Sequence, residues 1–204
     1  MSATAPAASP ARPGRPRDPG MDQRVYAAAR QIYVERGWSG FGFGPVARAA
    51  GVGKNALYLR WASPADLLLD ALVHRLRPYG DIDNADASLR DQLVAFATQL
   101  LCDYSGPAGL APLRIFVEAS VHTEIFAAFR ERLLEPSVRA ARALVERAIE
   151  RGEVTGDVDP VMLLDLVHGA AMSHAVLRPA ELGPLSAEAA HAYAVRIVDA
   201  ALPR

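Results

Sequence analysis

Apolar residues recur along this chain with the period of an α-helix. In the first such segment, which starts at Met21, apolar residues fall at spacings i, i+3, i+4, i+7 and i+8, namely Val25, Ala28, Ala29, Ile32 and Tyr33. Gly37 follows the last of them, at the position where glycine most often ends a helix. The pattern therefore predicts an amphipathic helix that begins at Met21 and ends before Gly37.

Shorter helical segments follow. Residues 38–45 predict a tight linker, residues 45–50 a short helix that Gly51 ends, and residues 54–60 a second short helix. Ser63 and Pro64 are typical of an N-cap and a first helical residue, and they predict a longer helix to about residue 77.

The rest of the chain predicts helix after helix. Ser88 and Asp91 have the spacing of a capping box, which predicts a helix to about residue 104. Further helices are expected at residues 113–122, 123–134, 136–151, 160–177 and 186–202. No alternating strand pattern is present, so we expect an all-α fold of about nine to ten helices. We expect three parts: a disordered basic arm at residues 1–20, a compact helical module at 21–62 and a larger helical bundle at 63–204.

Composition agrees with a globular helical protein. The chain of 204 residues is 51% hydrophobic and 22% charged, and it contains no apolar run long enough to span a membrane. The N-terminal segment has no apolar core of a secretory signal. The single cysteine, Cys102, cannot form an internal disulfide, and we interpret it as a small core residue in a cytoplasmic protein.

Charge is divided unevenly along the chain. Residues 1–60 carry a net charge of +6, whereas residues 61–204 carry −7. A basic end on an acidic body predicts that the N-terminal end meets a polyanion.

The segment GVGKNALYLRW, residues 51–61, holds the only lysine of the chain. Its G-x-G-K phrase is similar to the end of a nucleotide-binding P-loop, but that motif requires Gly where Arg48 stands and Ser or Thr where Asn55 stands. It also requires a preceding buried strand, and the segment before it predicts a helix. A nucleotide site is therefore not expected at Lys54.

A helix-turn-helix accounts for the same residues. Gly51 suits the turn because it has no Cβ to clash there, and the Val52 side chain is expected to pack from the turn into the core. Leu57 and Trp61, four residues apart, are expected to pack inward. Lys54, Asn55 and Tyr58 then point outward, and they offer a cation, an amide that can read adenine and a hydroxyl that suits a phosphate.

These residues resemble a known family. The segments RVYAAARQIYVERGW and VARAAGVGKNALYLRWASPADLLLDAL are similar to the N-terminal domain of TetR family transcriptional regulators. The resemblance implies a homodimeric, one-component DNA-binding regulator, most simply a repressor, with a ligand pocket in each C-terminal bundle. It implies phosphate contacts by Lys54 and Tyr58, base reading by Asn55 and Ala56 with help from Gly53, and a backbone or base contact by Arg48.

The chain departs from the family pattern at two places. FGFG, residues 41–44, stands where a Ser or Thr usually caps the second helix, and Pro64 replaces a usual lysine. A compensating segment is RPGRPR, in which Arg12, Arg15 and Arg17 are typical of arms that enter narrow A·T minor grooves. A solvated tail of biased composition is the alternative.

The C-terminal half contains no catalytic motif, and no cofactor is expected. His168 and His174 lie six residues apart on a helix, too far around it to hold one metal. A pocket for a small, mainly apolar effector is expected among residues of the middle helices, each of which is alternatively a core residue: Phe96, Leu100, Phe116, Glu118, His122, Phe126, Phe129 and Met172. Glu118 and His122, four residues apart, are either a polar spot in that pocket or a solvent-facing pair.

Small residues line one face of each of the last two predicted helices. Such faces let helix axes approach closely, and we expect residues 160–177 and 186–202 to form the homodimer interface. The leading hypothesis is thus a repressor that a small effector releases from a palindromic operator. The alternatives are a transcriptional activator, and a helical carrier or enzyme with an incidental helix-turn-helix.

Overall fold

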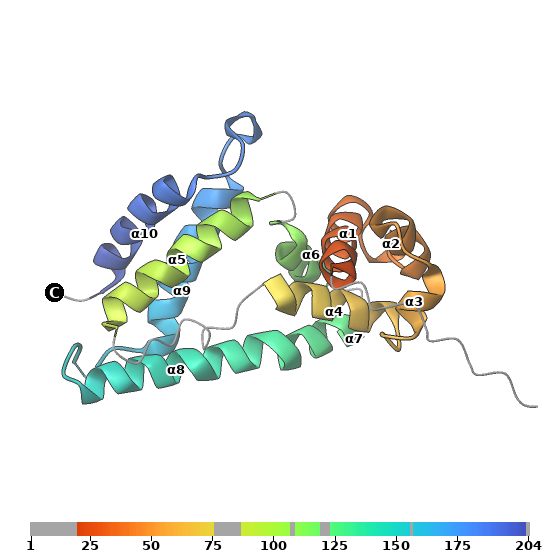
Figure 1. The fold of residues 1–204 in the computed structure, drawn as a ribbon. Coiled ribbons are helices and arrows are strands. Elements are labelled where there is room, and N and C mark those ends of the chain that lie inside the picture. Colours follow the sequence, from red (N-terminus) through yellow and green to blue (C-terminus); the bar gives the residue numbers. More distant parts are fainter. Residues whose placement is uncertain (1–19, 76–86, 107–108, 119–122, 156, 203–204) are drawn as a thin grey trace, which may run out of the picture.

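The computed structural model describes residues 20–75, 87–106, 109–118, 123–155 and 157–202 (Figure 1). The described residues form helices joined by turns, without a β-strand. The elements are α1 (Met21–Arg36), η1 (Trp38–Gly40), α2 (Phe43–Ala50), α3 (Lys54–Tyr58), α4 (Pro64–Arg75), α5 (Leu89–Ser105), α6 (Ala111–Glu118), α7 (Thr123–Phe129), η3 (Arg130–Leu134), α8 (Glu135–Glu150), α9 (Pro160–Val176), η4 (Ala180–Leu182) and α10 (Ala187–Ala201). The expected all-α fold is confirmed.

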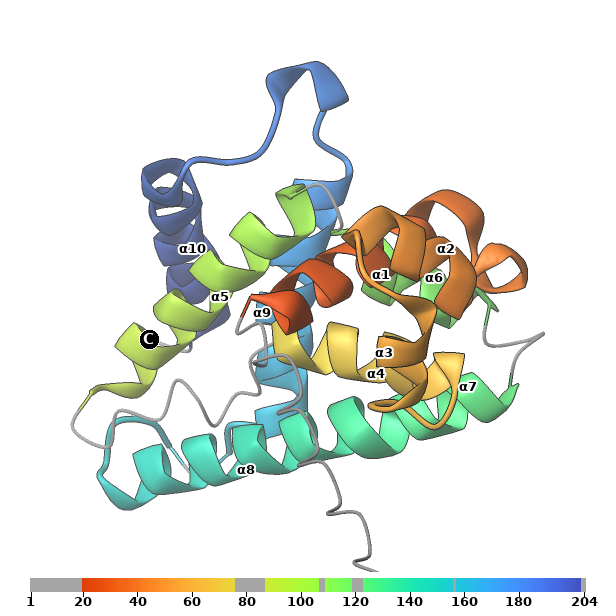
Figure 2. The same cartoon turned by 45° about the vertical axis from the view of Figure 1, so that its right-hand side comes forward.

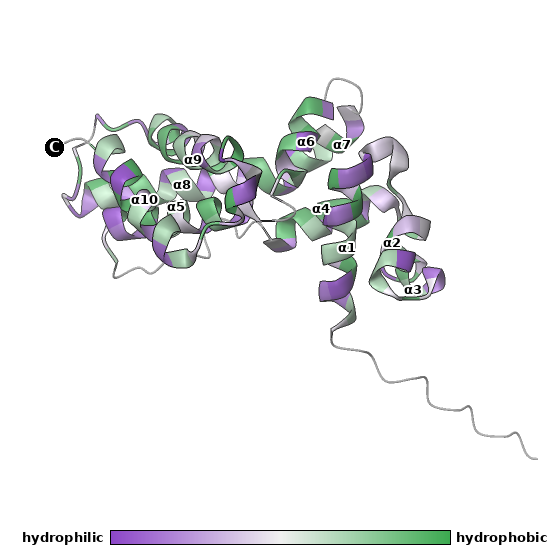
Figure 3. Cartoon of the chain, turned by 90° about the horizontal axis from the view of Figure 1, so that it is seen from above, coloured by the Kyte–Doolittle hydropathy of each residue, from purple (hydrophilic) through white to green (hydrophobic). Residues whose placement is uncertain are grey.

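The helices gather in two groups. Helices α1 to α4 lie together with α6 and α7, while α5, α9 and α10 lie together with most of α8 (Figure 3). The first group contains a core around Val25, Val46 and Leu57, and the second contains a core around Leu93, Val145 and Val167. Helices α7 and α8 form one long rod that runs beneath both groups (Figure 2).

Helix α4 lies between the groups and is apolar on more than one side. Leu67 and Ala71 complete the core formed by α1, α2 and α3. Leu68, Leu69 and Leu72 instead enter a third cluster with Ile115, Ile125, Phe129 and Leu133 from α6, α7 and η3. Because α4 follows α3 directly in the chain, it joins the short helices to the walls of the larger bundle.

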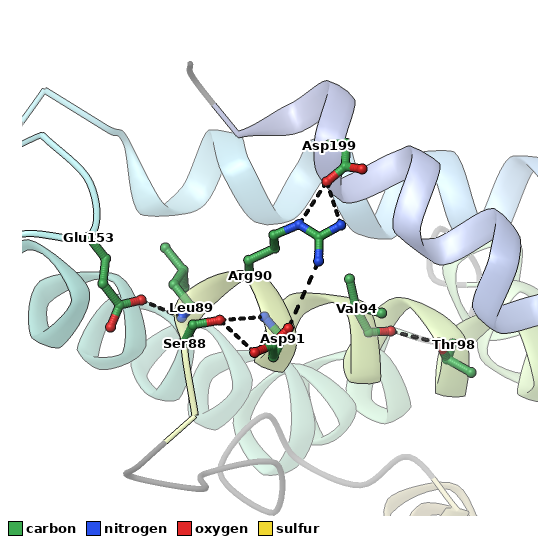
Figure 4. Close-up of polar contacts among 8 residues, drawn as sticks. All are labelled: Ser88, Leu89, Arg90, Asp91, Val94, Thr98, Glu153 and Asp199. Atoms are coloured by element: carbon green, nitrogen blue, oxygen red, sulfur yellow. Dashed lines mark hydrogen bonds and ion pairs between the residues drawn. The ribbon is translucent and has the colours of Figure 1, made fainter.

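Predicted helix caps are present. The Ser63 hydroxyl accepts the Asp66 N–H at 3.1 Å and donates to the Asp66 carboxylate at 2.8 Å, and Ser88 makes the same pair of bonds with Asp91. Figure 4 shows the second cap, together with Glu153, which accepts the Leu89 N–H at 2.5 Å. These bonds satisfy backbone donors that the first turn of a helix leaves without partners.

Polar contacts hold α5 against α10 and within its own turns. The Arg90 guanidinium donates to Asp199 of α10 at 2.8 Å, and the Thr98 hydroxyl donates to the Val94 carbonyl one turn before it (Figure 4). The apolar faces of α5, α9 and α10 meet in the core of the second group.

The predicted break before Pro136 is wrong. Helix α7 continues through η3, a π-helical segment, into α8, so residues 123–150 form one helical rod. Proline lacks an N–H and its ring clashes with the carbonyl four residues earlier in an α-helix. The wider π turn directly before Pro136 relieves that clash. Other expected bounds shift by a few residues: α2 begins at Phe43, α3 ends at Tyr58 and α6 begins at Ala111.

Candidate DNA interface and effector cavity

The turn between α2 and α3 is a Schellman motif. Gly51 adopts φ 66° and ψ 34°, its N–H donates to the Arg48 carbonyl at 3.3 Å, and the Val52 N–H donates to the Ala47 carbonyl at 3.0 Å. Val52 is partly buried against the α1–α3 core. The turn thus fixes the angle between two helices, as a helix-turn-helix requires.

Helix α3 presents a polar face to solvent. Leu57 is fully buried, whereas Lys54 and Asn55 are exposed and the Tyr58 side chain is 56% exposed. The Lys54 ammonium lies 5.4 Å from the centroid of the Tyr58 ring, which in turn meets the edge of buried Phe43 at a centroid distance of 4.7 Å. A cation, an amide and a phenol are therefore held on one exposed surface.

The other predicted DNA-contacting residues surround this surface. Gly53 is the N-cap of α3 with extended backbone, φ −69° and ψ 136°, and Ala56 is partly exposed. Arg48 is exposed on α2, and its guanidinium extends back to within 4.0 Å of the Cβ position of Gly44. Arg12, Arg15 and Arg17 lie outside the described residues.

The base of α3 is anchored to α4 and α1. The Trp61 indole N–H donates to Asp70 of α4 at 2.8 Å, and the Trp61 ring packs edge-on against Tyr26 of α1. Arg60 forms an ion pair with Asp22 of α1. These contacts join the C-terminal end of α3 to both α4 and α1.

A cavity of about 180 Å³ lies where the two groups of helices meet. Its walls come from α5, α6, α7, η3, α8 and α9, and its lining is predominantly apolar. The lining residues are Phe96, Leu100, Tyr104, Pro112, Phe116, Phe129, Leu133, Leu134, Ser137, Val138, Val161, Leu164, Asp165 and His168. Such a concave, mainly apolar space with a few polar groups is the usual form of a small-molecule site.

The structure brings half of the sequence-predicted pocket residues to this cavity. Phe96, Leu100, Phe116 and Phe129 line it. Met172 instead packs partly buried against the core of α5, α8, α9 and α10. His122 and the side chain of Phe126 lie outside what the structure describes.

Glu118 points away from the cavity, toward α1 and η1. Its carboxylate accepts hydrogen bonds from the Tyr33 hydroxyl at 2.9 Å, from the Trp38 N–H at 3.2 Å and from Arg114 at 2.9 Å. Burial alone would raise the pKa of Glu118, but these hydrogen bonds outweigh it and hold that pKa below its ordinary value. Glu118 thus belongs to a polar junction between α6 and the α1–η1 segment, and neither expected placement of this residue, in the pocket or facing solvent, describes it.

Sequence reasoning missed the polar groups of the cavity. The Tyr104 hydroxyl lies 3.0 Å from His168 Nε2, and Asp165 and Ser137 complete the polar part of the lining. Burial lowers the pKa of His168, although the Asp165 carboxylate opposes this, and burial raises the pKa of Tyr104 to about 12. The sequence signal was that His168 and Asp165 share one face of α9, three residues apart.

Apolar side chains of α9 lie in solvent. Met162 and Leu166 are exposed along this helix, and Leu166 and Ala170 line a groove that continues over Tyr193 and Arg196 of α10. On α10, Tyr193 also stacks on His174 of α9 at a centroid distance of 3.6 Å. The two predicted interface helices therefore share an apolar face that this chain leaves uncovered.

No described helix is long and apolar enough to cross a membrane. Within the same residues, no three His, Cys, Asp or Glu side chains lie close enough together to hold a metal ion.

Two family models match this chain and show which protein family it belongs to. Residues 25–71 match the model of bacterial regulatory proteins of the tetR family, and residues 83–201 match the model of the tetracyclin repressor-like C-terminal domain. The chain belongs to the TetR family of transcriptional regulators. The resemblance seen in the sequence is thus confirmed, and α2, α3 and their turn are the family's helix-turn-helix.

Individual relatives agree with this assignment. The chain is 30% identical to the DNA-binding transcriptional repressor TetR of Mycobacteroides abscessus over 86% of its own length and 88% of the relative. It is 35% identical to the HTH-type transcriptional regulator AqdR of Rhodococcus erythropolis over 67% of its own length and 65% of the relative. These relatives are regulators, not enzymes.

Solved structures share the fold. The fatty acid degradation regulator FadR of Bacillus halodurans superposes with a TM-score of 0.67 at 17% identity, covering 92% of this chain and 97% of its own. FadR of Bacillus subtilis, in complex with stearoyl-CoA, superposes with a TM-score of 0.63 at 15% identity, covering 88% and 97%.

Proposed function

We propose that this TetR family regulator is a homodimeric repressor that binds a palindromic operator and leaves it when a small, mainly apolar effector enters the cavity. The observation that carries the proposal is the position of one helix, α4. It is anchored to the exposed α3 face through Trp61 and Asp70, and its leucines pack on the helices that wall the cavity.

DNA contact is assigned to the exposed face of α3 and its surroundings. Lys54 and Tyr58 are proposed to hold phosphates, and Asn55 and Ala56, with the Gly53 turn, to read base edges in the major groove. Arg48 is proposed to support this contact from α2. Arg12, Arg15 and Arg17 are proposed to follow the neighbouring minor groove, where narrow A·T sequences concentrate negative potential.

Dimerisation is assigned to α9 and α10. Two copies of an exposed apolar face related by a two-fold axis would bury it and set the two α3 helices about 34 Å apart, one duplex turn. Substituting Leu166 by Glu would then place two charges at the interface. We expect Leu166→Glu to sediment as a monomer and lose operator binding.

A matched control separates loss of the dimer from the general effect of placing a charge at an exposed leucine. Leu110 is 48% exposed, against 50% for Leu166, but it lies directly before α6 and lines neither the cavity nor the α9–α10 groove. Leu110→Glu should remain a dimer. A dimeric Leu166→Glu protein, or a monomeric Leu110→Glu protein, would contradict the assigned interface.

Communication between cavity and DNA is assigned to two contacts. Arg132 of η3 pairs with Asp70 of α4, while the next two residues, Leu133 and Leu134, line the cavity. On α6, Phe116 lines the cavity. An effector that displaces η3 or α6 would shift the populations of dimers that fit and do not fit the operator.

The second contact uses the opposite face of α6. Arg114 donates to the Val34 carbonyl of α1 at 2.6 Å, and Glu118 accepts from Tyr33 and from the Trp38 N–H. Because α6 touches the cavity on one side and α1 on the other, its displacement moves the helix-turn-helix. Structural neighbours named as fatty acid regulators are compatible with an apolar effector here. A regulator of this kind works in the cytoplasm, where the DNA is.

The proposal is tested by binding to DNA from upstream of the protein's own gene. Fluorescence anisotropy with labelled duplexes, at several salt concentrations, should detect one dimer per specific site and an affinity that falls as salt rises. Absence of a specific complex at low salt across that region would count against an operator-binding repressor and favour the alternative of a helical carrier or enzyme. Activation of a reporter by the bound dimer would instead identify an activator.

A further inference from the structure

The cavity walls carry four aromatic side chains. Phe96 and Tyr104 come from α5, Phe116 from α6 and Phe129 from α7, and the rings of Phe116 and Phe129 meet edge to face at a centroid distance of 5.5 Å. Aromatic faces carry negative electrostatic potential and attract organic cations within about 6 Å of the ring centre. The apolar lining is therefore also a favourable surface for positive charge.

Asp165 is the single charged residue among the described residues that line the cavity. Asp165 is exposed on α9, and it forms no ion pair with another described residue. A carboxylate without a cationic partner repels an anionic ligand and attracts a cation. No described lysine or arginine lines the cavity to neutralise a carboxylate or phosphate of a ligand.

The neighbouring polar groups do not offset this charge. Burial lowers the pKa of His168, so the imidazole is neutral near pH 7.5, and the Tyr104 hydroxyl beside it stays protonated because its pKa is raised to about 12. His168 and Tyr104 hydrogen bond to each other at 3.0 Å. Among the described residues of the lining, the polar groups therefore carry together the negative charge of Asp165.

Size limits the ligand further. The cavity measures about 180 Å³. An apolar protein cavity of about 150 Å³ accepts benzene. A single ring with a short polar substituent is thus of the right size.

We propose that the cavity selects a compact organic cation, an apolar amine whose ring or chain lies among the aromatic side chains and whose charge lies beside Asp165. The inference rests on the proposed effector role of the cavity and adds the charge of the effector.

Three probes of similar size test the charge preference. 2-Phenylethylamine, 2-phenylethanol and phenylacetate are cationic, neutral and anionic at pH 7.5, and isothermal titration with the full-length protein measures each affinity. We expect the amine to bind about fivefold to tenfold more tightly than the alcohol. The preference is this small because Asp165 is exposed, and water and salt weaken the attraction between the two charges. Phenylacetate should bind most weakly. Equal affinities, a preference for the alcohol or carboxylate, or no binding of the amine would overturn the proposal.

Two substitutions locate the effect. Asp165→Asn keeps the shape of the side chain and removes its charge, and it should bring the amine to the affinity of the alcohol. Glu150→Gln removes an exposed charge near the end of α8, about 18 Å along the helix from Val138 of the cavity wall, and it should leave the preference unchanged. Retained amine preference in Asp165→Asn, or its loss in Glu150→Gln, contradicts the assignment to Asp165.

Operator binding distinguishes this inference from the proposed function. If the amine binds through Asp165 but the operator complex does not respond, the charge selection holds and the effector role fails. If phenylacetate releases the operator and the amine does not, the repressor function holds and the charge selection fails.

Discussion

Lys54 offers the sharpest test of how the protein holds DNA. It is the only cation within α3, it is exposed, and it forms no ion pair with a described residue. Arg60, just beyond α3, is already paired with Asp22. Removing Lys54 therefore removes the charge of the recognition helix without breaking a structural contact other than its position over the Tyr58 ring.

The magnitude follows from counterion release. Each phosphate contact contributes about −0.9 to the slope of log affinity against log salt, so Lys54→Ala should flatten the slope by about one unit per half-site. Each dimer makes two such contacts. When salt rises from 50 to 200 mM, the wild-type dimer should therefore lose roughly 12-fold more affinity than the Lys54→Ala dimer. Affinity should fall by a similar factor on all DNA sequences, because phosphate contacts do not read bases.

Fluorescence anisotropy of wild type and variants at four salt concentrations measures the slope. Lys54→Arg should keep it, because the charge remains, and Arg142→Ala should keep it because that exposed residue lies on α8, outside the DNA interface. An unchanged slope in Lys54→Ala would refute the docking of α3 on the DNA backbone.

Three further outcomes are expected. Asn55→Ala should relax preference at one base position per half-site by about 1–3 kcal/mol, and an unchanged profile on single-base operator variants would exclude Asn55 as a reader. Gly51→Ala should cost about 1–2 kcal/mol in thermal unfolding because φ is 66° there. Gly44 lies inside α2, without a positive φ and with room for a Cβ, and Gly44→Ala should cost nothing; equal losses would refute the backbone explanation. Because the folded pKa of Glu118 is depressed, its carboxylate stabilises the fold above the unfolded pKa of about 4.3, and this stability is lost as pH falls through the folded pKa. Glu118→Gln should therefore flatten the loss of urea resistance below about pH 4.5, and a variant as acid-sensitive as wild type would contradict the role of the junction.

Local chemistry made the helix-turn-helix predictable. The Gly51 turn, the Ser63 cap and the inward packing of Leu57 each depend on residues within a few positions of one another, and all three are present. The uninterrupted rod at Pro136 was not predictable in the same way. Proline ends most helices, and only the π turn before it, an arrangement without a sequence signature, keeps the rod continuous.

Several apolar residues that line the cavity could be predicted from the sequence, but the polar contacts among its lining residues could not. Its aromatic residues stand out in the sequence, but the contact between Tyr104 and His168 joins helices 64 positions apart, and no local pattern encodes it. Glu118 was placed in the pocket, or on the surface, by its spacing of four residues from His122. Helical period places it with Arg114, and away from Pro112 and Phe116, so the faces of α6 separate the junction from the cavity.

The central claim is tested most directly by selecting preferred DNA from a random pool with the full-length protein. The account predicts enrichment of an inverted repeat whose half-sites lie about one duplex turn apart, with one position in each half-site losing its preference in Asn55→Ala. Enrichment of no sequence, or of a single unrepeated site bound by a monomer, would contradict a dimeric operator-binding regulator.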